Sequence, residues 1–227
     1  MELLFTFGGK EMLIPDTIVN MYFVLIVLTV FALIVNKKLK STKVSEAPNG
    51  FLNVVEMLVE AINGLVKTTM GPQNMGFAPY IFALACFLGV ANLLGLIGLS
   101  PPTSDYSVTL SLALVTFALT QIFAYKNARG LGGYLKSFTQ PFVLLTPINL
   151  IGEVGNVISL SFRLFGNVMS GGIIITLVHN ALGYFAPIVS APLQIYFDVF
   201  SGLLQTFIFI MLTMIFVGGT AEPETNN

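Results

Sequence analysis

The sequence predicts an all-α integral membrane protein with five membrane-penetrating helices and one interfacial amphipathic helix. Hydrophobic residues make up 55% of the 227 residues, charged residues make up only 9%, and the mean hydropathy is +0.87. Apolar runs recur from one end of the chain to the other, and no polar block is large enough to form a separate domain. We therefore expect one integral membrane domain covering residues 1–227.

The first apolar run, 18–35, is expected to cross the membrane from the outside to the inside. It follows Asp16, and basic residues come after it. A cleavable signal peptide has the opposite order, with positive charge before the apolar region. Because basic residues mark the cytoplasmic side, this order predicts an N-terminus outside the cell. The basic residues are Lys37, Lys38, Lys40 and Lys43.

The segment 51–70 has the pattern of a helix that lies in the membrane interface. Its apolar residues recur at helical spacing on one face, while Glu56, Glu60 and Lys67 keep another side polar. The alternative is a membrane-spanning helix of low hydrophobicity, which the three charged residues disfavour.

Four further apolar segments predict the remaining crossings. The loops expected outside contain neither lysine nor arginine, whereas the inner ones contain Lys126, Arg129 and Lys136. This charge bias predicts a cytoplasmic C-terminus. The four segments are 77–99, 106–125, 148–183 and 192–217.

The segment 148–183 is too long for a simple crossing. As one helix it would reach about 54 Å, against a hydrocarbon thickness of about 30 Å. It must therefore tilt, bend or protrude, and we expect both this helix and the one over 192–217 to be strongly tilted.

Arg163 lies inside the apolar segment 148–183. A cation at bilayer depth costs from about 3 kcal/mol on insertion scales to 10 or more in simulations, so it marks a candidate functional site. At 100° per residue, it belongs to a polar stripe about 120° wide on this helix. A second stripe, about 60° wide, follows the last helix, and the two stripes can face each other. The first contains Glu153, Asn156, Ser159, Arg163, Asn167 and Ser170, and the second contains Gln194, Asp198, Ser201 and Gln205.

Structural roles compete with functional ones for these residues. Asn, Gln and Ser join helices by hydrogen bonds in many membrane proteins. A salt bridge between Arg163 and Asp198 would neutralise both charges in a static bundle. Glu153 suits a helix start at the cytoplasmic interface. For His179, the sole histidine, interfacial anchoring explains its position as well as proton transfer does.

The sequence lacks the motifs of soluble enzymes. It has no phosphate-binding loop, no zinc-ligand cluster and no hydrolase triad, so we expect no nucleotide site, cofactor or metal. The net charge of -1 also disfavours a nucleic-acid partner. Cys86 is the only cysteine and is expected to fill the apolar interior.

Four stretches resemble one known family. Residues 161–167, SFRLFGN, and the small residues that follow are similar to the hallmark of subunit a of F-type ATP synthases. Residues 101–110, 147–153 and 204–209 resemble the same subunit in order and spacing. The resemblance covers most of the chain from Phe77 onward, whereas the N-terminal third matches mainly in the arrangement of its predicted helices.

The resemblance implies a stator in a bacterial-type plasma membrane. Such a subunit holds two offset half-channels against a rotating c-subunit ring, alongside the b subunits of the peripheral stalk and the remaining ATP synthase subunits. The transported ion is H⁺ or Na⁺. Arg163 matches the essential arginine that separates the half-channels. The implied outer path contains Asp198, Asn167, Gln205, Asn92 and Ser170, and the implied cytoplasmic path contains Glu153, Asn156 and Ser159.

One position departs from the family pattern. Many bacterial members have an acidic residue nine positions after the arginine, where this chain has Gly172. Asp198 stands where several members have histidine or glutamate, so we expect it to supply the acidic group of the outer path.

Two other functions compete with the rotary one. A secondary transporter could use the midmembrane arginine to bind an anionic solute, although no convincing internal repeat is present. A structural scaffold would hold Arg163 in a static salt bridge.

Overall fold

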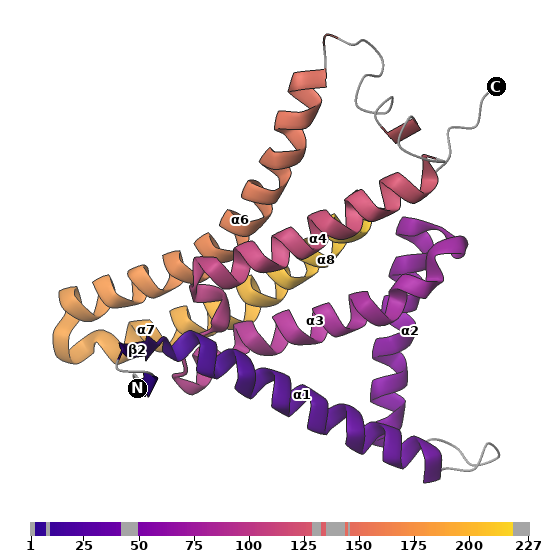
Figure 1. The fold of residues 1–227 in the computed structure, drawn as a ribbon. Coiled ribbons are helices and arrows are strands. Elements are labelled where there is room, and N and C mark those ends of the chain that lie inside the picture. The colour runs from indigo at the N-terminus through magenta and orange to yellow at the C-terminus, as the bar shows by residue number, and fades with distance from the viewer. Residues whose placement is uncertain are drawn as a thin grey trace.

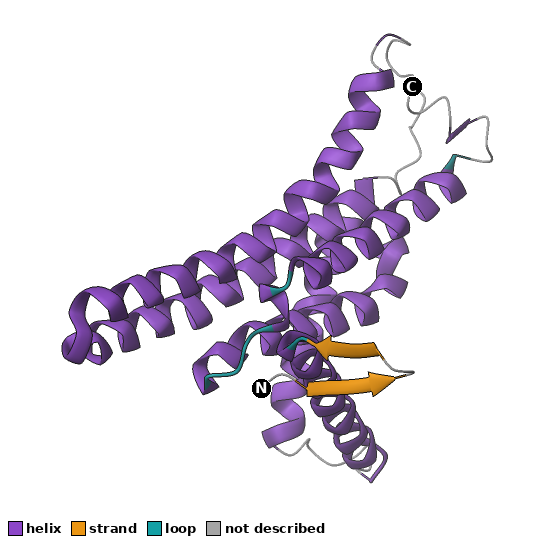
Figure 2. Cartoon of the chain, turned by 60° about the vertical axis from the view of Figure 1, so that its left-hand side comes forward, coloured by secondary structure: helices purple, strands orange, loops and turns teal. Residues whose placement is uncertain are grey.

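The computed structural model describes residues 3–7, 10–41, 50–128, 133–134, 144 and 146–219. This part of the chain is helical apart from one short β-hairpin near the N-terminus (Figure 2). The predicted helical class is therefore confirmed for this part of the chain. The hairpin was not predicted from the sequence; it pairs β1 (Leu3–Phe7) antiparallel with β2 (Lys10–Ile14), with Leu3 opposite Ile14.

Two helices follow the hairpin. In α1 (Asp16–Ser41), Asp16 lies in the first turn and Lys38 and Lys40 lie in the last, so their charges complement the helix dipole. The second helix, α2 (Gly50–Met70), runs across the ends of α1 and α3 (Ala78–Leu93) rather than alongside them (Figure 1).

Short 3₁₀ turns connect α3 to its neighbours: η1 (Pro72–Phe77) before it, and η2 (Leu94–Ile97) and η3 (Pro102–Ser104) after it. Gly98 ends η2 with a φ of 75°, a conformation that a Cβ atom would strain. The next helix, α4 (Tyr106–Asn127), begins where the Asp105 side chain accepts a hydrogen bond from the Ser107 amide at 2.8 Å.

The last third of the described chain is a helical hairpin. Its first arm is α6 (Thr146–Leu182), which changes direction in its N-terminal half (Figure 1). The turn η5 (Gly183–Phe185) leads into the return arm. That arm consists of α7 (Ala186–Ile195), one π-helical turn η6 (Tyr196–Ser201) and α8 (Gly202–Gly219).

Four described segments are long and apolar enough to cross a membrane: Asp16–Ser41, Pro72–Ile97, Tyr106–Lys126 and Thr146–Gly219. The fourth is 74 residues long and includes both arms of the hairpin. The count of five crossings and the tilt of the long helices stay predictions. Lys43, Arg129 and Lys136, which contribute to the predicted orientation, lie outside the described residues.

A core of buried apolar side chains joins α2, α3, α4, α6 and α8. It includes Ile81, Leu88, Leu164, Phe209 and Met214, which are fully buried. By contrast, Val24 is the only buried residue of α1. The core therefore packs α6 and α8 of the helical hairpin against α3 and α4, while α1 lies largely outside this core.

Candidate functional site

Arg163 is exposed on α6 and has no hydrogen bond or ion pair within the described residues. Its neighbours Leu160 and Leu164 point into the core, with 2% and 0% of their surface exposed. The flanking Phe162 and Phe165 contact the Tyr106 ring of α4, with centroid separations of 5.0 and 5.7 Å. The structure thus fixes the helix around Arg163, while the guanidinium makes no hydrogen bond or ion pair with the side chains that the structure describes.

Asp198 does not pair with Arg163 in the described structure. It lies on the π-helical turn η6 and packs against Gly95 of η2: a Cβ atom added to Gly95 would lie 2.5 Å from the Asp198 Oδ2 atom. That oxygen is buried and has no hydrogen-bond partner within the described residues. Gln194 lies beside it and donates its Nε2 hydrogen to the Gly95 carbonyl at 2.8 Å.

The two polar stripes meet at Asn167 and Ser201. The Ser201 hydroxyl donates a hydrogen bond to the Asn167 Oδ1 atom, which joins α6 to η6. Ser170 is exposed and donates only to the Asn167 carbonyl on its own helix. Gln205 is 6% exposed, and its Nε2 atom has no partner within the described residues.

Asn92 joins three elements through its side chain. Its Nδ2 group donates to the Gly202 carbonyl and the Thr206 hydroxyl, both at 3.1 Å, and its Oδ1 atom accepts from Thr103 at 2.9 Å. Gly202 permits this approach because a Cβ atom there would lie 3.0 Å from the Asn92 Cβ. Asn92 is 2% exposed, so these bonds satisfy a buried amide.

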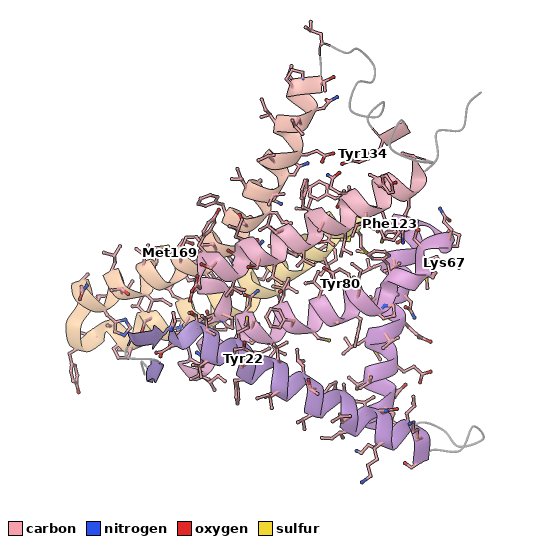
Figure 3. The ribbon with its side chains drawn as sticks, in the orientation of Figure 1. Tyr22, Lys67, Tyr80, Phe123, Tyr134 and Met169 are labelled. Atoms are coloured by element: carbon pink, nitrogen blue, oxygen red, sulfur yellow. The ribbon has the colours of Figure 1, made fainter. Side chains whose placement is uncertain are left out.

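A second polar group lies toward the N-terminal end of α6. Glu153 is half-buried and accepts a hydrogen bond from Gln121 Nε2 of α4. The Tyr134 hydroxyl donates to Gln121 Oε1 at 2.5 Å (Figure 3). Burial, and secondarily the Glu153 charge, raise the pKa of Tyr134, which keeps its hydroxyl a donor.

A cavity of about 180 Å³ adjoins Glu153 between α4, α6 and α8. Glu153 and Asn156 line it together with Gln121, Thr116 and Thr120. Ser159 is exposed on α6 and does not line this cavity.

Sequence reasoning did not single out Gln121, Thr116 or Thr120. The signal was present, because Thr116 and Thr120 are four residues apart in an apolar helix and therefore lie on one face. The structure shows that this face lines the same cavity as Glu153 and that Gln121 bonds Glu153 there. His179 is exposed on α6, and its Nδ1 atom lies 2.9 Å from the Ile175 carbonyl of the same helix.

Comparison with known proteins assigns the family. Residues 18–218 match the family model described as ATP synthase A chain. This chain belongs to the ATP synthase subunit a family. The family predicted from residues 161–167 is thereby confirmed, and with it a membrane role in ATP synthesis and ion transport.

Several relatives of this subunit a family member match over three quarters or more of its length. It is 34% identical to the ATP synthase subunit a of Citrifermentans bemidjiense, covering 97% of this chain and 93% of the relative. The subunit a of Moorella thermoacetica is 33% identical, covering 90% and 89%. The ATP synthase subunit a 2 of a Bradyrhizobium strain is 37% identical, covering 75% of each chain.

Proposed function

We propose that this chain is a stator subunit of a rotary F-type ATP synthase that provides two offset half-channels for ions. The half-channels lead to and from carboxylates on the c-ring, and Arg163 separates them. The observation that carries the proposal is an exposed arginine within an apolar helix that has no hydrogen bond or ion pair among the described residues, with a polar cluster on either side of it along the helix.

Arg163 acts as a fixed charge for a carboxylate that moves past it. A guanidinium favours the ionised form of a nearby carboxylate, so it promotes ion release there. It also repels cations and so blocks direct leakage between the half-channels. Gly166 and Gly172 support this role, since a Cβ atom at either position would meet nothing within 4 Å and a ring helix can approach closely.

The cytoplasmic half-channel includes Glu153 and Asn156 and adjoins Ser159. The cavity of about 180 Å³ beside Glu153 has room for several water molecules and offers them carboxylate, amide and hydroxyl partners. The bond from Gln121 holds the Glu153 carboxylate at the wall of this cavity.

The outer half-channel includes Asp198, Asn167, Gln205, Ser170 and Asn92. Asp198 supplies the acidic group, and its buried Oδ2 atom has no hydrogen-bond partner among the described residues. Asn92 holds α3 against α8 beside this path. Either H⁺ or Na⁺ is compatible with this set of oxygen-rich side chains.

In this proposal, residues 1–227 form one domain that crosses the membrane five times. Its N-terminus is outside, its C-terminus is in the cytoplasm of a bacterial-type cell, and α2 lies in the interface. The transverse course of α2 in Figure 1 supports this arrangement. The c-ring, the b subunits of the peripheral stalk and the other ATP synthase subunits are the proposed partners.

Replacing Arg163 tests the proposal. Arg163→Lys should abolish ATP-driven ion pumping and ATP synthesis in inverted membrane vesicles, because an ammonium does not reproduce the guanidinium geometry. Subunit co-purification should stay normal, since Arg163 has no partner among the described residues. Lys67→Gln on the exposed polar face of α2 is the matched control. Normal ion pumping by the Arg163→Lys complex would refute the proposal.

Transport of an anionic solute by the chain alone is the alternative. A solute transporter would need a pocket around Arg163, whereas the cavity beside Glu153 does not include Arg163 in its lining. Solute uptake by liposomes containing only this chain would favour the alternative.

A further inference from the structure

Gln194 belongs to the polar stripe predicted for the last helix, and the proposed ion path does not use it. It lies on α7, four residues before Asp198, so the two side chains project from the same side of this arm of the hairpin. Both side chains reach the 3₁₀ turn η2, and there they contact the same residue, Gly95. Gln194 is partly buried at this contact.

The two contacts at Gly95 are of different kinds. The Gly95 carbonyl accepts hydrogen bonds from Gln194 Nε2 at 2.8 Å and from the Gly98 amide at 2.9 Å, so both lone pairs of its oxygen are used. The Asp198 carboxyl group lies against the Cα atom instead, because a Cβ atom there would come within 2.5 to 2.8 Å of its Oδ2, Cγ and Oδ1 atoms. The absence of a side chain at Gly95 therefore leaves the space that this carboxyl group occupies.

Gln194 links the two contacts. Its side chain interacts with the Asp198 carboxyl group as well as with the Gly95 carbonyl. An amide nitrogen carries two hydrogens, so one Nε2 group can serve a carbonyl and a neighbouring carboxylate together. The Gln194 amide thus holds the end of α7 to η2 at the place where Asp198 packs.

This contact also bears on the distance between the two charges of the hairpin. The bond between Ser201 and Asn167 fixes one level of the two arms. Asp198 lies three residues before Ser201, and Arg163 lies four residues before Asn167 on the antiparallel arm, so the two charges are separated by about 10 Å along the helix axes. Opposite charges still attract over that distance in a membrane interior. A carboxylate free to turn toward Arg163 would favour a static ion pair.

We propose that Gln194 is a positioning residue of the outer half-channel, which holds the Asp198 carboxyl group against Gly95 and away from Arg163. This role rests on the proposed ion path. Gln194 itself makes no contact with the ion, and it acts through Asp198 by fixing where the outer acidic group lies. Arg163 then remains available to a carboxylate of the c-ring.

Removing the amide tests the hydrogen bond. Gln194→Leu keeps the approximate size of the side chain but removes the donor to the Gly95 carbonyl. ATP synthesis by the complex in inverted vesicles should fall about fivefold, which is the effect of losing one neutral hydrogen bond. Val189→Thr, at an exposed position of the same helix, is the control and should keep the wild-type rate. A wild-type rate in Gln194→Leu would overturn the proposal.

Gln194→Glu gives a readout that a purely structural role would not change. An ionised glutamate cannot donate to the Gly95 carbonyl and repels Asp198, whereas a protonated glutamate can donate as glutamine does. Burial and the neighbouring carboxylate both favour the protonated form. Acidifying the outer side should therefore restore activity in Gln194→Glu but not in Gln194→Leu.

The outer side corresponds to the lumen of inverted vesicles, so its pH can be set before synthesis is driven by a potassium–valinomycin potential. Relative to the wild type, the rate of Gln194→Glu should rise several-fold between about pH 8 and about pH 6, whereas that of Gln194→Leu should stay constant. The titratable side chains of η2, α7 and η6 are Asp198 and Tyr196, and the wild type contains both. No recovery of Gln194→Glu would contradict the proposal, and this measurement stands even if Gln194→Leu fails to assemble.

A double-variant cycle tests whether Gln194 acts through Asp198. Asp198→Glu keeps an acidic group, so its synthesis rate should remain measurable. If Gln194 positions Asp198, the combined Gln194→Leu and Asp198→Glu variant should lose less activity than the product of the two separate losses. Losses that multiply would show that the two residues act independently and would overturn the proposal.

The Arg163→Lys variant separates this role from the proposed function. A wild-type rate in Gln194→Leu together with an inactive Arg163→Lys complex would refute only the role of Gln194. An active Arg163→Lys complex would refute the ion path on which that role rests.

Discussion

At the scale of single residues, the polar side chains of α6 differ in whether the chain itself provides their partners. Glu153 and Asn167 are each bonded to another element, whereas Arg163 has no partner in the described structure. Leaving a cation unpaired at bilayer depth is unfavourable. In the proposed site, a carboxylate of the c-ring supplies the partner that Arg163 lacks among the described residues.

Gln121 is the residue whose removal should disturb the proposed cytoplasmic path most selectively. Gln121→Leu keeps the approximate size of the side chain but removes its bond to Glu153. A hydrogen bond to a charged group contributes roughly 1.5 to 3 kcal/mol, so we expect ATP-driven pumping to fall about tenfold or more.

The measurement is the initial rate of ion uptake by inverted vesicles containing equal amounts of complex. Ser111→Ala, which alters an exposed serine of the same helix, is the control. Unchanged pumping by Gln121→Leu would remove Gln121 from the proposed path.

At the scale of elements, the π-helical turn η6 divides the polar stripe predicted for the last helix. Ser201 contacts Asn167 of α6, whereas Asp198 packs against Gly95 beside α3. A π turn contains an extra residue, so it shifts the phase of the side chains around it relative to a regular α-helix. Such turns occur often at functional sites, which agrees with the proposed role of Asp198.

Gly95 should matter because it makes room for Asp198. In Gly95→Ala, the new Cβ would lie 2.5 Å from the Asp198 Oδ2 atom, so the carboxylate must move. We expect a loss of ion flux and a destabilisation of about 1 to 3 kcal/mol from overpacking.

Gly89→Ala on the neighbouring α3 is the matched control, because a Cβ atom there meets nothing within 4 Å. Ion flux in reconstituted vesicles and thermal unfolding of the complex report the two effects. If both variants behave alike, Asp198 does not depend on the space at Gly95.

At the scale of the whole molecule, the proposed topology follows from the order of the candidate membrane spans, while α2 runs across the ends of α1 and α3 (Figure 1). Ser100 then lies in the outer loop and Lys126 at the cytoplasmic end of α4. The two positions are exposed, so a reagent can reach both.

Cysteine labelling tests this orientation. In a Cys86→Ser background, a membrane-impermeant maleimide should label Ser100→Cys in intact cells and Lys126→Cys only in inverted vesicles. The reverse pattern would invert the topology, and labelling of both from one side would contradict a crossing by α4.

Much of the fold was predictable because it depends on local properties of the chain. Runs of apolar residues long enough for a bilayer indicated the helices: 106–125 corresponds to Tyr106–Asn127, and 148–183 corresponds to Thr146–Leu182. The weak pattern of residues 3–14 did not indicate a hairpin, because two isolated strands gain little stability of their own.

The sequence by itself determined the membrane class and the helix positions, since apolar length can be assessed residue by residue. It also predicted a functional role for Arg163, because the energy of a charge in an apolar segment can be assessed in the same way. The tertiary structure decided which polar groups meet: Gln121 with Glu153, Ser201 with Asn167, and Asp198 with Gly95. These pairs are far apart in the chain. Their contacts depend on how helices cross and where a π turn shifts the side chains, and helical periodicity alone does not specify either.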